Sequence, residues 1–188
     1  MTNHIIYQWI KMCDSRHELF FLSNEFESWT YSDLAQALRR CELDLNNINP
    51  ATCLIEGDYS LHSIAWLIAG LSFGWKMVPI VSKSSAVINI RKNVSNATFR
   101  VSPENSWGLE RISEDVPDIQ THKLSESGVV LFSSGTTGKP KAMCKSMNSM
   151  LKGVENQKGK SVTMGLLLLF DHIGGLNTLF AGIRKSAH

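Results

Sequence analysis

The feature that most constrains the fold is an apolar helical segment that lies between two short apolar runs. Leu61 to Phe73 is almost wholly apolar, and a helix that is apolar on all sides must be buried. Thr52 to Ile55 before it and Met77 to Val81 after it are short and rich in apolar residues, which is typical of buried strands. Strands joined through a helix pair in parallel, so this unit predicts a parallel sheet covered by helices.

The same alternation of helical and extended patterns continues on both sides of this unit. Residues 102–127 interrupt it with prolines, many charges and little periodicity, and predict an irregular connection with a short strand at Gly108 to Ile112. The whole pattern predicts an α/β fold with a parallel-rich sheet flanked by helices. The further predicted helices are His4 to Met12, Tyr31 to Leu45 with Ser32 as its cap, Ala86 to Lys92, Asn148 to Gln157 and Gly174 to Ile183. The further predicted strands are Leu19 to Leu22, Phe26 to Trp29, Ala97 to Val101, Gly128 to Phe132, Ala142 to Ser146 and a buried Val162 to Leu169.

Composition and charge exclude several classes of function. The net charge of +2 over 188 residues, with both signs mixed along the chain, is too small for a nucleic-acid interface. The four cysteines are widely spaced without a C-x-x-C pair, so they are not a metal-ligand set and they indicate a reducing compartment. The start of the chain lacks the pattern of a signal peptide, and no apolar run is long enough to span a membrane. We expect a cytoplasmic protein with no metal site of its own, no nucleic-acid partner and no membrane contact.

A loop rich in glycine, hydroxyl groups and lysine follows the strand predicted at Gly128 to Phe132. It reads Ser133-Ser134-Gly135-Thr136-Thr137-Gly138-Lys139-Pro140-Lys141. Glycines let the backbone approach a ligand closely, while hydroxyls, backbone N–H groups and lysines can bind phosphate oxygens. These residues predict a nucleotide-phosphate loop. The alternative is a polar turn between two strands, which would not require the lysines.

The loop differs from the Walker type of phosphate loop. That motif has a longer spacing between its glycines and a Ser or Thr directly after its lysine. Here only Thr136 and Thr137 separate the glycines, and Pro140 follows Lys139. Since proline disfavours a helix at the residue before it, the chain should continue extended through Lys141 and Met143.

The run Ser133 to Lys141 resembles the phosphate-binding signature of the AMP-forming adenylating enzymes, a superfamily of acyl-CoA synthetases, peptide-synthetase adenylation domains and luciferases. Further segments resemble the same family in the same order, and together they span nearly the whole chain. The family pattern continues with a glycine and a later histidine, where this sequence has Ala142 and Met147. The further segments are Trp29-Thr30-Tyr31-Ser32-Asp33-Leu34, Ile64 to Ile80, and Phe170-Asp171-His172-Ile173-Gly174-Gly175-Leu176.

The resemblance implies two groups of site residues. His172, Gly174 and Gly175 are implied at the border of the carboxylate and acyl pocket, and His172 and Lys139 are the candidate catalytic residues. Lys139 would neutralise phosphate charge during the displacement. The residues implied to bind the phosphates of ATP are Ser133, Ser134, Gly135, Thr136, Thr137, Gly138, Lys139 and Lys141.

Some of these residues also have a plainer interpretation. Lys141 can equally be a solvated strand residue. A single histidine after a hydrophobic strand is usually a hydrogen-bonded structural residue, but the position of His172 favours the pocket, because ligands gather at the carboxyl ends of parallel strands. Asp171 can orient the imidazole or cap the following helix, and we expect the cap.

The activity that the resemblance implies is ATP-dependent activation of a carboxylic acid. The carboxylate attacks the α-phosphorus of ATP to give an acyl-adenylate and pyrophosphate, with Mg²⁺ on the phosphates, and the thiol of coenzyme A or of a carrier protein then attacks the adenylate. The family's metal-binding carboxylate, its ribose-binding acidic residue and its C-terminal domain with a catalytic lysine have no counterpart in this sequence. We therefore interpret residues 1–188 as one incomplete domain, the first part of the large N-terminal domain of an adenylating enzyme.

An incomplete domain is expected to be inactive alone and to expose apolar surface and open strand edges. We therefore expect self-association or a complementing chain. The alternative is a non-catalytic module, truncated or split, that binds nucleotide or another protein without turning nucleotide over. A further alternative is a structural domain whose loop has lost its function.

Overall fold

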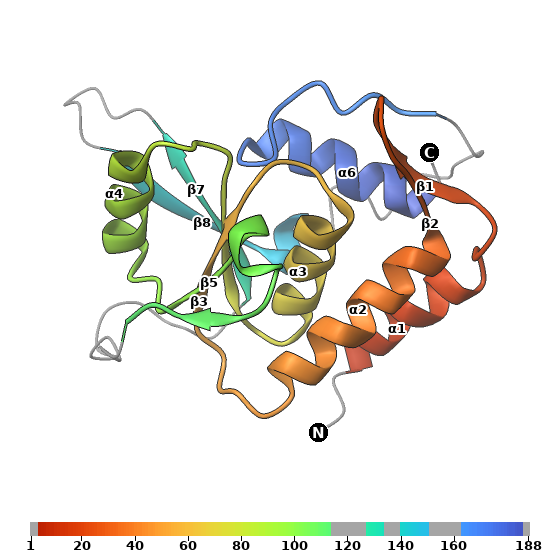
Figure 1. The fold of residues 1–188 in the computed structure, drawn as a ribbon, viewed down its shortest axis with the longest axis horizontal. Coiled ribbons are helices and arrows are strands. Elements are labelled where there is room, and N and C mark those ends of the chain that lie inside the picture. The colour runs from red at the N-terminus through yellow and green to blue at the C-terminus, as the bar shows by residue number, and fades with distance from the viewer. Residues whose placement is uncertain (1–3, 114–126, 134–139, 151–162, 186–188) are drawn as a thin grey trace.

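A six-stranded sheet forms the centre of the molecule (Figure 1). The computed structural model describes residues 4–113, 127–133, 140–150 and 163–185. The strands of the sheet are β3 (Thr52–Glu56), β4 (Lys76–Ile80), β5 (Phe99–Val101), β6 (Glu110–Arg111), β7 (Gly128–Ser133) and β8 (Lys141–Ser146). Their order is β6-β5-β3-β4-β7-β8; the inner four are parallel, and β6 and β8 are antiparallel edge strands. The predicted α/β class with a parallel-rich sheet is therefore confirmed.

Helices lie on both sides of this sheet (Figure 1). They are α1 (His4–Asp14), α2 (Tyr31–Leu45), α3 (Leu61–Ser72), α4 (Ser85–Ser95) and α6 (Ile173–Lys185). Helix α4 covers one face, and α3 covers the other, together with α2, α6 and a small antiparallel sheet of β1 (Phe20–Ser23) and β2 (Ser28–Thr30). Successive strand residues therefore alternate between two cores: Leu54 and Val78 lie under α4, whereas Cys53 and Met77 lie under α3.

The apolar helix predicted between two strands is α3. All of its residues except His62 are buried, as its composition requires. Its first turn is capped by Ser60, whose hydroxyl accepts from the Ser63 N–H at 3.0 Å. Near its end, Gly70 lies so close to Met77 of β4 that a side chain at this position would overlap the methionine, and the helix can therefore approach the sheet closely.

The cap of α2 differs from the predicted one. Thr30 accepts from the Asp33 N–H, and the Asp33 carboxylate accepts from the Thr30 N–H at 2.7 Å, which together form a capping box. Ser32 was predicted to cap this helix, and that prediction is wrong, because the helix begins at Tyr31 and Ser32 lies inside its first turn.

The prediction of a strand at Val162 to Leu169 is also wrong for the residues that the structure describes. Residues 163–169 contain no strand, and Leu167 and Leu169 are 94% and 54% exposed. A strand needs a neighbour that pairs with its backbone and covers its apolar side chains. None of the strands that the structure describes pairs with this segment, so its leucines remain at the surface.

The remaining elements agree with the predictions to within a few residues. The helix predicted at Asn148 to Gln157 lies mostly outside the described residues, although residues 147–150 are helical. The irregular connection contains a short 3₁₀ turn at Pro103–Asn105 before β6. Among the helices that the structure describes, none has the length and apolar character needed to cross a membrane.

The cysteine thiols fall into a buried set and an exposed one. Cys13, Cys41 and Cys53 are buried and Cys144 is exposed on β8, and none of them forms a disulfide. Burial raises the pKa of Cys13 to about 12 and also raises the pKa values of Cys41 and Cys53. The reactive species of cysteine is the thiolate, so these buried thiols are inert in the folded state.

We predict that a thiol reagent such as Ellman's reagent labels Cys144 rapidly in the native protein and the buried cysteines only after unfolding, because burial suppresses both access and ionisation. Release of the coloured thiolate measures this directly. Cys144→Ser is the control and should remove the rapid phase. Rapid labelling of any further thiol in native buffer would contradict the packing of the core.

Candidate functional site

The predicted phosphate loop connects β7 and β8. Ser133 at the end of β7 pairs with Lys141 at the start of β8, and the hairpin continues from there to Gly128 and Ser146. The expectation that the chain runs extended after Pro140 is therefore confirmed. Of the other predicted phosphate-binding residues, Ser134, Gly135, Thr136, Thr137, Gly138 and Lys139 lie outside the described residues.

The two ends of this loop lie at the carboxyl end of a parallel strand. β7 runs parallel to β4, which runs parallel to β3, so the loop leaves the sheet at the edge where ligands collect in α/β folds. Ser133 is half-buried, and the side chain of Lys141 is exposed. A cavity of about 230 Å³ opens beside both loop ends, and it is lined by Val87, Ile90, Arg91, Phe132, Ser133 and Pro140.

The turn from Phe170 to Gly175 forms the second part of the candidate site. Phe170 is fully buried, and its N–H donates to the Asp58 carboxylate at 3.1 Å. Its ring packs edge-on against Tyr59 at a centroid distance of 5.1 Å. These contacts fix the turn to the loop that follows β3, and hence to the carboxyl end of the sheet.

His172, and not Asp171, caps α6. The imidazole Nδ1 accepts a hydrogen bond from the Gly174 N–H at 3.1 Å, and the His172 carbonyl accepts from the Leu176 N–H. An Nδ1 that accepts is unprotonated, so the proton of the neutral ring lies on Nε2. The imidazole is otherwise exposed. The prediction of Asp171 as the cap is wrong, because its carboxylate is held by another group.

That group is Arg91 of α4. Its Nη1 lies 2.6 Å from Oδ2 of Asp171, and the two side chains are 19% and 15% exposed. The guanidinium also lies over the ring of Phe132, 5.2 Å from the centroid. Sequence reasoning missed Arg91, because it lies on a mixed helix face with no motif around it and its partner is 80 positions away.

The two glycines predicted at the acyl pocket are packed closely. A Cβ at Gly175 would overlap the Tyr59 hydroxyl and lie 2.6 Å from the carbonyl oxygen of Leu169. A Cβ at Gly174 would lie 2.6 Å from Cδ1 of Leu168. Gly175 therefore requires glycine, because backbone carbonyls limit the space there, whereas at Gly174 the nearest atom is the end of a leucine side chain that can move. The requirement at Gly175 is a structural reason independent of any ligand.

The Tyr59 hydroxyl is buried against Gly175. It has no hydrogen-bond partner among the residues that the structure describes. Burial raises the pKa of this phenol well above its ordinary value, and the nearby carboxylates of Asp58 and Asp171 raise it further. The side chain therefore stays neutral and acts as a packing element of the turn.

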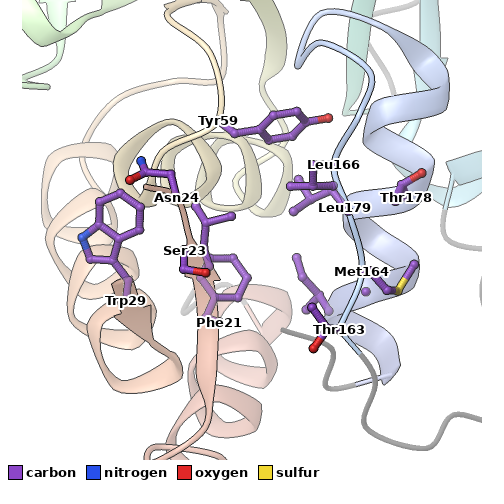
Figure 2. A pocket seen from close by; sticks show the side chains of 14 residues that line it. Phe21, Ser23, Asn24, Trp29, Tyr59, Thr163, Met164, Leu166, Thr178 and Leu179 are labelled. Carbon is purple, nitrogen blue, oxygen red and sulfur yellow. The ribbon is translucent and has the colours of Figure 1, made fainter. Parts of the chain in front are cut away.

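A second, larger cavity lies beside α6, and the sequence did not predict it (Figure 2). It has a volume of about 350 Å³ between the β1–β2 hairpin, residues 163–166 and α6. Figure 2 shows Phe21 and Trp29 on one side and Leu166, Met164 and Leu179 on the other, with Tyr59 at one end. None of the described residues predicted for the site lines it. It adjoins the segment whose leucines are exposed.

No metal centre is apparent in this part of the molecule. In residues 4–113, 127–133, 140–150 and 163–185, no cluster of three or more His, Cys, Asp and Glu side chains could hold a metal ion. The candidate site is thus a loop junction, an exposed histidine at a helix N-terminus and an arginine between them.

Comparison with known proteins identifies the fold. No protein-family model and no curated protein sequence matches the chain. The o-succinylbenzoate coenzyme A synthetase MenE of Bacillus subtilis, solved with AMP, is 17% identical with a TM-score of 0.67, over 95% of this chain and 54% of that one. The N-terminal subdomain of NpsA from Klebsiella oxytoca is 17% identical with a TM-score of 0.70, over 97% and 53%. The luciferase-like enzyme of the mealworm Zophobas morio is 20% identical with a TM-score of 0.68, over 100% and 53%.

These similarities concern the fold of the chain and the share of each matched structure that the chain covers. The chain has the fold of the first part of the N-terminal domain of adenylating enzymes, as the resemblance of its motifs predicts. It spans about half the length of the structures that it matches.

We predict that Gly175→Ala lowers the free energy of unfolding by about 1–3 kcal/mol, because the new methyl group meets backbone carbonyls that cannot move aside easily. Thermal or urea unfolding measures the change. Gly165→Ala is the matched control, since its nearest neighbour would lie at 3.7 Å, an ordinary contact. Tyr59→Phe removes a buried hydroxyl without a described partner and should be neutral or stabilising. Equal stability of Gly175→Ala and Gly165→Ala would contradict the packing described here.

Proposed function

We propose that this chain is part of an ATP-dependent adenylating ligase that activates a carboxylic acid, and that it supplies the ATP-phosphate loop and part of the acyl pocket. The observation that carries the proposal is the position of the Ser133 to Lys141 signature. It begins at the carboxyl end of β7, in a sheet with the fold of the adenylating enzymes. One protein that shares this fold, MenE, is solved with AMP and with the acyl-adenylate OSB-AMP, which supports adenylate chemistry as the class of reaction.

In the proposed reaction, the loop holds the β- and γ-phosphates of ATP. The hydroxyls of Ser134, Thr136 and Thr137 donate to phosphate oxygens, and Gly135 and Gly138 let the backbone come close. Lys139 offsets the negative charge that develops on pyrophosphate when the substrate carboxylate displaces it from the α-phosphorus. The products of this step are an acyl-adenylate and pyrophosphate. The thiol of coenzyme A or of a carrier protein would then take the acyl group and release AMP.

His172 is proposed to meet the carboxylate of the acid. Because its Nδ1 accepts from the Gly174 N–H, its Nε2–H remains a donor that a carboxylate oxygen can accept. The residue also lies directly before α6, and the N-terminus of a helix carries partial positive charge. Gly174 and Gly175 belong to the same turn, and their proposed place at the border of the acyl pocket rests on the motif resemblance, because their Cβ positions face the protein itself.

Mg²⁺ is assigned only as the counter-ion of ATP. The described residues contain no cluster of His, Cys, Asp and Glu side chains that would fit a resident metal ion. The proposed location is the cytoplasm, where ATP is supplied and where buried thiols stay reduced.

We predict that the purified chain binds ATP and that Lys139→Ala weakens this binding about tenfold or more, since a hydrogen bond to a charged group contributes about 1.5–3 kcal/mol. Isothermal titration calorimetry with ATP up to millimolar concentration measures it. Lys145→Ala is the matched control, because Lys145 lies on the same hairpin but pairs with Val129, away from the loop.

The control variant should bind ATP as the unaltered chain does. Equal loss in both lysine variants would indicate a general charge effect instead of a phosphate site. Absence of any ATP binding by the unaltered chain would contradict the proposed function and favour a structural domain whose loop has lost its role.

We also propose that the exposed leucine segment is an association surface. Leu167, Leu168 and Leu169 are 94%, 48% and 54% exposed and adjoin the cavity beside α6. β8 is an edge strand of the sheet and its side chains are mostly exposed. An exposed apolar run and an open strand edge each favour pairing with another chain, whether a second copy or a complementing polypeptide.

We predict that the purified chain self-associates at micromolar concentration, and that Leu167→Lys combined with Leu169→Lys shifts it toward the monomer, because charge opposes burial of that segment. Light scattering coupled to size exclusion measures the mass. Leu43→Lys is the control, since Leu43 is a 77% exposed leucine on α2, away from the segment. A monodisperse monomer at high concentration would contradict this surface.

A further inference from the structure

We infer that Arg91 is a positioning residue that holds the His172 turn in register with the strand that carries the phosphate loop. The inference rests on the proposed function, because the two parts that Arg91 joins are its two half-sites. Nothing in the motif resemblance involves Arg91, and the assignment comes from contacts alone.

The first contact crosses the edge of the sheet. Arg91 belongs to α4 on one face, and Asp171 lies two positions before the start of α6, which packs on the opposite face (Figure 1). The ion pair between them is short, at 2.6 Å, and both side chains are mostly buried. It therefore ties together layers that the sheet separates, at the carboxyl end of the parallel strands.

The second contact reaches the loop. The Arg91 guanidinium stacks on Phe132, the residue before Ser133, at 5.2 Å from the ring centroid. Arg91 also lines the small cavity together with Ser133 and Pro140, which flank the two ends of the loop. An arginine can form an ion pair in the plane of its guanidinium while its face covers an aromatic ring, and a lysine ammonium cannot do both in this geometry.

The ion pair also changes the charge beside His172. An unpaired Asp171 would place a negative charge next to the imidazole proposed to receive a carboxylate, and like charges repel. Pairing with Arg91 offsets that charge. Arg91 thus serves the site in two ways, by geometry and by charge, without touching the reacting atoms.

A comparable ion pair elsewhere in the chain has a different role. Arg100 and Glu110 pair at 2.7 Å with side-chain exposures of 32% and 42%, but they join the neighbouring strands β5 and β6 at the far edge of the sheet. That pair supports local strand register. Arg100→Met is therefore a matched control for Arg91→Met, with the same chemistry removed away from the site.

The turn carries its own reporters for an experiment. The N–H groups of Phe170, His172, Gly174 and Leu176 are hydrogen-bonded to Asp58, Leu169 and His172. Their hydrogen exchange measures how firmly the turn is held. We would record exchange by mass spectrometry on the full chain, as the unaltered protein, Arg91→Met, Arg91→Lys and Arg100→Met, each without and with millimolar ATP.

Without ATP, Arg91→Met should speed hydrogen exchange in the turn by about tenfold and change exchange in α3 by no more than about twofold. Arg91→Lys should give an intermediate rate in the turn. Arg100→Met should leave exchange in the turn unchanged. Unaltered exchange in the turn of Arg91→Met would overturn the inference. So would an equal rise in α3, because that would mark Arg91 as a general stabilising residue.

With ATP, the unaltered chain should show slower exchange both in the peptide that spans residues 133–141 and in the turn. In Arg91→Met, ATP should still slow the loop peptide and no longer slow the turn, which a merely structural role would not produce. Equal protection of the turn by ATP in both proteins would overturn the coupling. If ATP slows exchange in neither region of the unaltered chain, the proposed function fails. In that case, faster exchange in the turn of Arg91→Met without ATP would identify Arg91 as a structural clamp and overturn its positioning role.

Discussion

The burial of α3 is the constraint on which the rest of the structure depends. Because all but one of its residues are buried, the helix needs neighbours on every side, and it receives them from the sheet, α1 and α2. β3 precedes this helix in the chain and β4 follows it. The two strands are therefore parallel, and their carboxyl ends lie at the same edge of the sheet. β7 then joins β4 in the same direction and brings the loop residues to that edge. The location of the candidate site thus follows from the need to bury one helix.

The elements around α3 could be predicted from the sequence because their signals are local. Apolar runs, helical spacing and glycine or proline at the ends identify β3, α3, β4 and the start of β7 to within a residue or two. The cap of α2 was missed although its signal was present: Thr30 is followed three positions later by Asp33, which is the spacing of a capping box. The extended course after Pro140 could be predicted for the same reason, since proline acts on its own neighbours.

The features that could not be predicted depend on distant partners. Residues 163–169 have the composition of a buried strand, but a strand exists only where another strand pairs with it, and the described residues provide none. The ion pair of Arg91 with Asp171 joins positions 80 residues apart, and no periodicity records such a pair. The motif resemblance indicated the loop and the histidine turn as candidate site segments, but it gave no sign of the contacts of Arg91 with Asp171 and Phe132.

The structural and functional interpretations of His172 are compatible at the level of its atoms. The cap of α6 uses Nδ1 as an acceptor, which orients the ring and leaves the proton on Nε2, the form that can donate to a carboxylate. An aspartate in the capping position would satisfy the same N–H groups but would place a negative charge where the proposed substrate carries its own. The structure avoids this by using the imidazole as the cap and pairing Asp171 with Arg91. A helix N-terminus capped without a net negative charge keeps its partial positive charge available to an anionic ligand.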